Sequence, residues 1–320
     1  MSAKQEYHIS QKEFSSYRYN FVKYLDDIES FLDEALAKGL LSEEHRSVIM
    51  THRNPDEQHR CLYGFLYPKL PYASDELMLA LKNSNQNRIS ILFDKSAYPM
   101  KFKPHGRVIL INNVKFDDEE KHQERFGSEK DVEGITKLFT DFNFDVQLYS
   151  NKTAEEMKAI IEKASKESTA REDCFVMFLM SHGVIGNIVG TDGEKLSYST
   201  IKTILRDSSQ LKNKPKLIYV NACRVTYEKK AEEGYSNVPD LFVTYATIAE
   251  RQAYRTDVRG SIFIKCLLTV YEKNKKECNI VSLSPEINEQ VSKESNEISE
   301  NQVSIVYSTL KKQVILRAKD

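Results

Sequence analysis

The sequence predicts an all-helical N-terminal domain followed by an α/β domain, whose mostly parallel sheet is covered by helices on both faces. The 320 residues are enough for two domains of ordinary size. Apolar residues recur every three to four positions through the first 90 residues, which is typical of helices. From residue 107, short strand-like runs alternate with helical stretches, and several of these runs are continuously apolar.

In the N-terminal domain, apolar positions between Phe21 and Leu36 follow the spacing of one helix face and predict a single amphipathic helix. Gly39 is expected to end this helix, because glycine readily adopts the left-handed conformation found after a helix. Ser42 is expected to cap the next helix. Further apolar stretches at 61–67 and 77–81 predict a compact bundle of about five or six short helices.

In the second domain, each apolar run predicts one strand and each amphipathic stretch predicts one helix. The expected strands cover residues 108–111, 146–149, 175–180, 217–220, 242–247 and 303–309. The expected helices cover residues 128–142, 154–164, 199–206 and 261–271. Residues 87–106, with two prolines, are expected to join the two domains.

Composition excludes several classes of protein. The net charge is −1 without a basic patch, so nucleic acid is not an expected partner. No apolar run reaches 18 residues, and the N-terminus lacks the apolar region of a secretory signal, so we expect a cytoplasmic protein without a membrane span. The five cysteines are odd in number and never form a C-x-x-C pair, which argues against disulfides and a zinc site. No metal or cofactor is expected, and every cysteine but one is expected to be a small core residue: Cys61, Cys174, Cys266 and Cys278.

Two expected strands end in residues that could do chemistry. Residues 175–180 lead into His182 and Gly183, and residues 217–220 lead into Cys223. Sites in open α/β sheets form beyond the carboxyl ends of the strands, where an imidazole could take the thiol proton and later protonate a leaving amine. The N–H groups of Gly183 and Cys223 could stabilise an oxyanion. A lone histidine is usually a surface residue and a lone cysteine usually a core one, so these positions alone leave catalysis open; the other six histidines receive no role.

At these residues the chain resembles the caspases. The stretches that resemble the caspase large subunit are RVILINNVKF, ERFGSEKDVEGITKLF, EDCFVMFLMSHG, GTDG and KNKPKLIYVNACR. Those that resemble the small subunit are VPDLFVTYAT, YRTDVRGSIFIKCLLTVYEK and QVSIVYSTLKKQVIL, so the resemblance extends from Tyr98 to Leu316. LDDIESFLDEALAKGLLSEEHRSVI and ASDELMLALKNSNQNRISILF resemble a caspase-recruitment domain, which is a death-fold bundle.

The resemblance implies a domain plan and a role for each motif residue. The implied plan is a recruitment domain at 1–92, a linker at 93–106, a large-subunit region at 107–224, an inter-subunit segment at 225–239 and a small-subunit region at 240–320. His182 and Cys223 match the catalytic pair, and Gly183 matches the oxyanion-hole glycine. Arg125 and Arg255 match the two arginines that hold the substrate's aspartate in the family. Arginine suits this role, since two guanidinium groups can form planar, charge-assisted bonds with one carboxylate.

Three features depart from the family pattern. The nucleophile motif Q-A-C-[RQG]-G reads N-A-C-R-V here. Asn221, expected to bind substrate, is one methylene shorter than the family's glutamine, and Val225 would be strained if the glycine that it replaces needs a positive φ. Tyr254, before Arg255, keeps the aromatic bulk expected in the substrate site. The segment 225–239 contains no Asp, so we expect no self-cleavage there, whereas Asp94 is a candidate processing site.

Three functions follow from these observations. The first is an initiator-type protease of apoptosis or a related pathway, which is made as a zymogen and cuts proteins after aspartate. It would be recruited by an adaptor with a caspase-recruitment domain and would dimerise through the strand at 303–309. The second is a weakly active or inactive decoy that acts through domain contacts, as Asn221 and Val225 would favour. The third, a related protease that cuts after a basic residue, would require carboxylates in place of Arg125 and Arg255.

Overall fold

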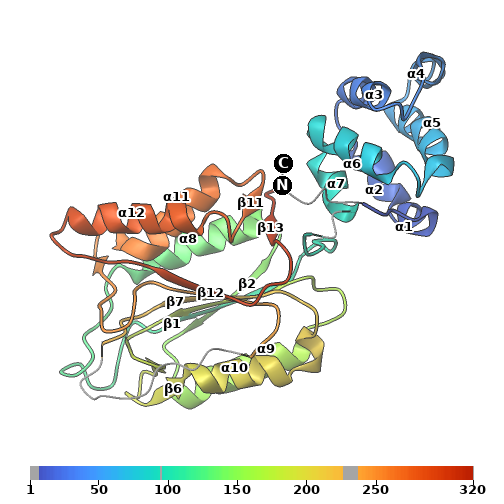
Figure 1. The fold of residues 1–320 in the computed structure, drawn as a ribbon. Coiled ribbons are helices and arrows are strands. Elements are labelled where there is room, and N and C mark those ends of the chain that lie inside the picture. The colour runs from blue at the N-terminus through green and yellow to red at the C-terminus, as the bar shows by residue number, and fades with distance from the viewer. Residues whose placement is uncertain (1–6, 94–95, 226–236, 320) are drawn as a thin grey trace. The chain divides into compact units, whose positions relative to one another are not determined.

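The computed structural model describes residues 7–93, 96–225 and 237–319. The chain forms two compact units, Met1–Pro99 and Met100–Asp320 (Figure 1). Within the described ranges, no helix has the length and apolar character needed to cross a membrane.

The first unit is helical, as predicted, and packs around one apolar core. Its described helices are α1 (Gln11–Ser16), α2 (Arg18–Tyr24), α3 (Ile28–Ala37), α4 (Glu43–Met50), α5 (Pro55–Leu66), η1 (Tyr67–Lys69), α6 (Ser74–Asn83) and α7 (Asn87–Phe93). There are thus more short helices than the five or six expected, and α7 occupies the start of the segment that the sequence assigned to the connection between domains.

The single helix predicted between Phe21 and Leu36 is wrong, because the chain breaks between α2 and α3. Asp27 has a φ of 42°, in the left-handed region, and its side chain accepts a hydrogen bond from the Ser30 N–H at 3.2 Å. The apolar spacing continues across the break, so periodicity alone could not reveal it. The helix end at Gly39 is confirmed by its φ of 71°, and Ser42 caps α4 through the His45 N–H.

The second unit contains a six-stranded sheet whose order is β12-β8-β7-β3-β1-β2. Its strands are β1 (Arg107–Asn112), β2 (Asp145–Ser150), β3 (Phe175–Met180), β7 (Lys216–Asn221), β8 (Leu241–Tyr245) and β12 (Ile305–Ser308). All pairs are parallel except β12 with β8. All six predicted strands are therefore confirmed, and β12 lies at an edge of the sheet.

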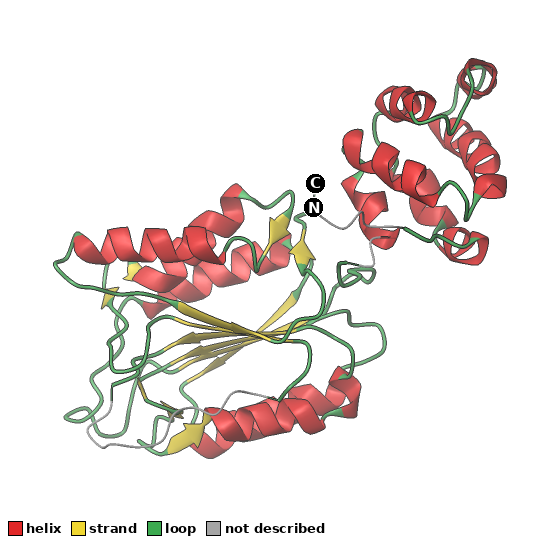
Figure 2. Ribbon diagram, viewed as in Figure 1, coloured by secondary structure: helices red, strands yellow, loops and turns green. Residues whose placement is uncertain are grey.

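Helices cover both faces of this sheet, as predicted (Figures 1 and 2). On one face lie α8 (Ser128–Asp141), α11 (Ile262–Lys273) and α12 (Ser284–Asn296), and on the other lie α9 (Ala154–Glu167) and α10 (Tyr198–Asp207). The helix α12 was not predicted from the sequence, because its buried face consists only of Ile287, Val291 and Ser295. Also not predicted were the short strands β4 (Gly183–Val184), β5 (Asn187–Val189), β6 (Lys195–Ser197), β9 (Arg255–Thr256), β10 (Gly260–Ser261), β11 (Cys278–Asn279) and β13 (Ile315–Leu316).

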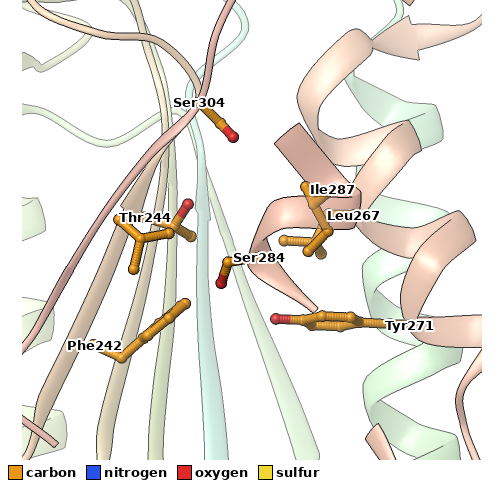
Figure 3. A pocket seen from close by; sticks show the side chains of 8 residues that line it. Phe242, Thr244, Leu267, Tyr271, Ser284, Ile287 and Ser304 are labelled. Atoms are coloured by element: carbon orange, nitrogen blue, oxygen red, sulfur yellow. The ribbon is translucent and has the colours of Figure 1, made fainter. Parts of the chain in front are cut away.

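A small cavity lies between the sheet and helices α11 and α12 (Figure 3). Its volume is about 10 Å³, which is room for about one water molecule. The hydroxyl groups of Thr244, Ser284 and Ser304 lie on its wall beside the rings of Phe242 and Tyr271. This cavity is far smaller than a substrate site, so it belongs to the packing of the core.

Candidate active site

The two predicted catalytic residues follow neighbouring strands at matching positions. Strands β3 and β7 are parallel partners, and Met180 at the end of one pairs with Asn221 at the end of the other. His182 and Cys223 each come two residues further along, so both lie at the same edge of the sheet. A Cβ atom on Gly183 would lie only 2.8 Å from the carbonyl oxygen of Cys223, so this position requires glycine for the two loops to meet.

The imidazole of His182 is held by a backbone carbonyl. Its Nε2 lies 2.8 Å from the oxygen of Gln123, and its ring packs against Phe116 and His122 at centroid distances of 4.8 and 5.4 Å. Burial is the main reason that the pKa of His182 is lowered to about 4; the hydrogen bond with Gln123 opposes this shift, and the nearby positive charge of Arg125 adds to it. The ring is therefore neutral at pH 7 and able to accept a proton. Neither Gln123 nor His122 was assigned a role from the sequence. Every residue has a backbone carbonyl, so the contact of Gln123 with His182 could not be predicted from the residue type.

Replacing His182 by glutamine is expected to make the protein less sensitive to acid. Because the folded-state pKa of His182 lies below its ordinary value of about 6.5, the wild type loses stability as pH falls from about 6.5 towards 4. His182→Gln removes this loss, which we expect to be at most about 2 kcal/mol for a partly exposed ring. Urea unfolding at pH 7.5 and pH 5 measures it, and equal losses of stability in both proteins would contradict the assignment.

The thiol of Cys223 lies beside a loop that comes from another part of the chain. Cys223 is half-buried, and its Sγ accepts a hydrogen bond from the Ala253 N–H at 3.4 Å. This donor can stabilise negative charge on the sulfur. By contrast, Cys174, Cys266 and Cys278 are buried, as predicted, and burial raises the pKa of Cys266 to about 12, so that thiol stays protonated and inert.

The guanidinium of Arg125 lies inside the protein. Arg125 is 2% exposed, and its Nη1 donates to Asn112 Oδ1 at 3.1 Å and to the Asn113 carbonyl at 2.7 Å, both at the end of β1. Burial, and to a smaller extent the charge of Arg255, lower its pKa to about 9. The sequence analysis missed the two asparagines, although they follow an apolar strand just as His182 and Cys223 do.

The second predicted arginine, Arg255, lies on the hairpin of β9 and β10, beside the segment that contains Arg125. Arg255 Nε donates to the carbonyl oxygen of Phe126 at 2.7 Å, and Phe126 is the residue that follows Arg125 in the chain. Burial lowers the pKa of Arg255, whereas Asp131 and Cys223 raise it. A buried guanidinium and a partly buried one that repel one another favour an anionic ligand between them. The structure therefore brings together the two arginines and the thiol predicted from distant motifs.

Asn221 does something different from what its motif position implies. It is buried, and its Nδ2 donates to Ser261 Oγ at 2.7 Å. Ser261 in turn donates to Asp131, from its N–H to Oδ1 at 2.9 Å and from its hydroxyl to Oδ2. Burial raises the pKa of Asp131 to about 6, although these hydrogen bonds lower it. The side-chain amide of Asn221 is thus bound to Ser261 within the protein, and this contact joins the end of β7 to the hairpin that carries Arg255.

Gly127 allows the two arginine-bearing segments to touch. Its φ is 84°, and a Cβ there would lie 2.5 Å from the Thr256 carbonyl oxygen. Gly127→Ala is expected to lower the free energy of unfolding by about 3 kcal/mol, because both the backbone and the contact resist a methyl group. Gly186→Ala is the matched control, since its φ of 78° is similar but a Cβ there meets nothing within 4 Å; we expect about 1 kcal/mol. Equal losses in urea unfolding would refute the close contact.

Val225 is accommodated without left-handed backbone. It is absent from the described residues with positive φ, and it forms a parallel β-bridge with Val184. The Ile185 N–H donates to its carbonyl oxygen at 3.3 Å. The condition under which a β-branched residue would be strained after the nucleophile is therefore not met.

Other predicted positions are less central. The Glu300 carboxylate raises the pKa of the Tyr254 hydroxyl, and the Tyr254 N–H donates to Gln302 Oε1 at 2.9 Å. Asp94 and residues 226–236 lie outside the described residues.

Within the described part of the chain, no cluster of three or more metal-ligating side chains occurs. Neither the cavity under α11 nor a surface hollow of about 380 Å³ between α9 and α10 contains any of the site residues, so the strand ends locate the site.

Comparison with known proteins identifies the second unit. The family model of the caspase domain matches residues 105–315, which include every described residue of the site. Caspase-7 of Gallus gallus is 30% identical over 228 residues, which are 65% of this chain and 73% of that protein. Caspase-2 of Gallus gallus is 26% identical over 61% of this chain and 53% of its own, and caspase-8 of Mus musculus is 27% identical over 69% and 54%. The chain thus spans about half the length of these last two relatives.

Proposed function

Because this chain belongs to the caspase family, we propose that it is a cysteine endopeptidase that cleaves protein substrates after aspartate. The observation that carries the proposal is the meeting of Cys223 and His182 with two arginines, Arg125 and Arg255, whose mutual repulsion favours a substrate carboxylate between them. Asp131, when ionised, offsets part of the positive charge of both arginines. A neutral side chain would leave the buried donors unsatisfied, so an acidic residue before the scissile bond is strongly preferred.

The geometry supports acyl transfer. Neutral His182 takes the proton of the Cys223 thiol, and the thiolate attacks the backbone carbonyl carbon of the substrate's aspartate. The N–H groups of Gly183 and Cys223 stabilise the oxyanion. When the C–N bond breaks, His182 gives its proton to the leaving amine, and water then hydrolyses the thioester and restores the thiol. Gln123 and Phe116 hold the imidazole through these steps.

The remaining parts of the proposal concern regulation. The helical unit recruits the protease, as an initiator-type zymogen of apoptosis, to an adaptor with a caspase-recruitment domain. Edge strand β12 pairs with a second copy, since its outer side is open to another strand among the described residues. Processing occurs near Asp94 and not within residues 225–239, which contain no Asp. Intact mass after incubation of the active protein tests the last point, and fragments ending within 225–239 would contradict it.

The second candidate is a decoy that binds but does not cleave. Its support is the altered motif, since the amide of Asn221 is bound to Ser261. Val225 gives it little support, because its backbone is unstrained.

Turnover of three fluorogenic tetrapeptides, ending in Asp, Asn and Lys, distinguishes the candidates. The full-length protein is assayed in a kosmotropic salt, which strengthens apolar burial and favours the dimer. The expected result is turnover of the Asp peptide far above that of the Asn peptide, and none of the Lys peptide. Absence of turnover in a folded, dimeric protein would establish the decoy, and cleavage of the Lys peptide would overturn the role of the arginines.

A further inference from the structure

A buried glutamine outside the catalytic motifs holds the loop that lies against the nucleophile. Gln302, between α12 and β12, has no exposed surface. Its Nε2 donates to the Ala246 carbonyl oxygen at 2.8 Å, and its Oε1 accepts the Tyr254 N–H at 2.9 Å. Its own N–H donates to Ser295 Oγ at 3.0 Å, at the end of α12. The side chain of Gln302 therefore joins both ends of the loop 246–254, and its backbone N–H anchors it to the helix α12.

This loop contacts the catalytic strand end along its length. The Arg224 N–H donates to the Arg251 carbonyl at 2.9 Å, and the Ala253 N–H donates to Cys223 Sγ at 3.4 Å. Arg255 follows directly after Tyr254, so the peptide that Gln302 holds lies between the thiol's donor and the second arginine. A shift at Tyr254 would move both groups together.

We propose that Gln302 is a positioning residue, which fixes the loop 246–254 so that the Ala253 N–H meets Cys223 and Arg255 meets the substrate carboxylate. The inference rests on the proposed function. A primary amide suits this place because it must donate on one side, to Ala246, and accept on the other, from Tyr254. Gln302 also links the active site to the segment that enters the edge strand β12, the surface on which a second copy is expected.

The first test compares Gln302→Met with Asn288→Leu. Methionine keeps the volume but removes both hydrogen bonds. Asn288 is the matched control, because its Oδ1 accepts the Ser304 N–H at 2.9 Å and so ties the same segment to α12 without touching the loop. For Gln302→Met, we expect kcat/KM for the Asp peptide to fall about 100-fold, with KM raised, since displacement of about 1 Å has effects of this size. A purely structural role would reduce the amount of active enzyme and leave KM unchanged.

A readout that does not depend on turnover separates this inference from the proposed function. Hydrogen exchange of the peptide that covers residues 247–256 should quicken at least about tenfold in Gln302→Met, because the Tyr254 N–H loses its acceptor. It should stay unchanged in Asn288→Leu. If exchange of residues 247–256 is faster in Gln302→Met but the wild-type protein shows no turnover, the positioning role is upheld and the protease is refuted. Unchanged exchange would overturn the positioning role itself.

Gln302→Glu provides a conservative rescue if Gln302→Met does not fold. An ionised carboxylate would accept from Tyr254 but repel the Ala246 oxygen, whereas a protonated carboxyl group could donate to it and reproduce the amide. Burial raises the pKa of such a group, since the side chain at position 302 has no exposed surface. The ratio of the variant's kcat/KM to that of wild type should therefore rise as pH falls from 8 to 6. A ratio independent of pH would overturn the inference.

Discussion

Replacing Cys223 by alanine is expected to reduce turnover of an Asp-ended peptide by at least about 10⁴-fold, to the background of the assay. The thiol supplies the bond to the acyl group, and no other described cysteine can replace it, since the remaining thiols lie elsewhere and three are buried. The loss should appear in kcat, with melting temperature within a few degrees of wild type, because Cys223 is only half-buried.

Cys61→Ala is the matched control for this result. Cys61 is also half-buried but lies in the helical unit, so its loss should change kcat/KM less than threefold. A Cys223→Ala protein that retained a tenth of wild-type turnover would show that another group, or a contaminating protease, performs the cleavage.

Arg255→Gln is expected to reduce kcat/KM for the Asp peptide about 10³-fold. Removing one partner of a desolvated charge pair has effects of roughly 2–5 kcal/mol, and about 4 kcal/mol corresponds to this factor. The same change should have little effect on an Asn-ended peptide, which has no carboxylate to lose. The ratio of the two kcat/KM values therefore measures recognition of the charge directly.

Arg259→Gln is the control for this prediction, since Arg259 is an exposed arginine on the same hairpin and we expect a change below threefold. An equal fall for the Asp and Asn peptides in Arg255→Gln would indicate damage to the hairpin. In that case the Nε contact with the Phe126 carbonyl, rather than substrate binding, would explain the effect.

The sequence by itself determined the type of secondary structure in each domain and placed His182 and Cys223 at the ends of two strands, whereas the catalytic role predicted for them came from the likeness to the family. All six strands of the main sheet, and the four helices predicted in the second domain, were found within a few residues of their expected bounds. His182 and Cys223 were located because apolar strands are recognised locally, and because sites lie at the ends of parallel strands. The two arginines came only from the likeness to the family, since nothing near them in the chain marks a buried guanidinium.

The tertiary structure decided the contacts between distant parts of the chain. Ser261 and Asp131 lie 130 residues apart, and Gln302 and Tyr254 lie 48 apart, yet each pair is joined by hydrogen bonds. The break between α2 and α3 and the polar helix α12 involve the same kind of contact. The Asp26 N–H donates to Gln86 Oε1 at 2.9 Å, and Glu294 on α12 forms an ion pair with Lys265 on α11 at 2.6 Å. Helical and strand periodicity express which face of an element is buried. They do not express which element covers that face, and this is the information that places the carbonyl of Gln123 on His182 and the amide of Asn221 on Ser261.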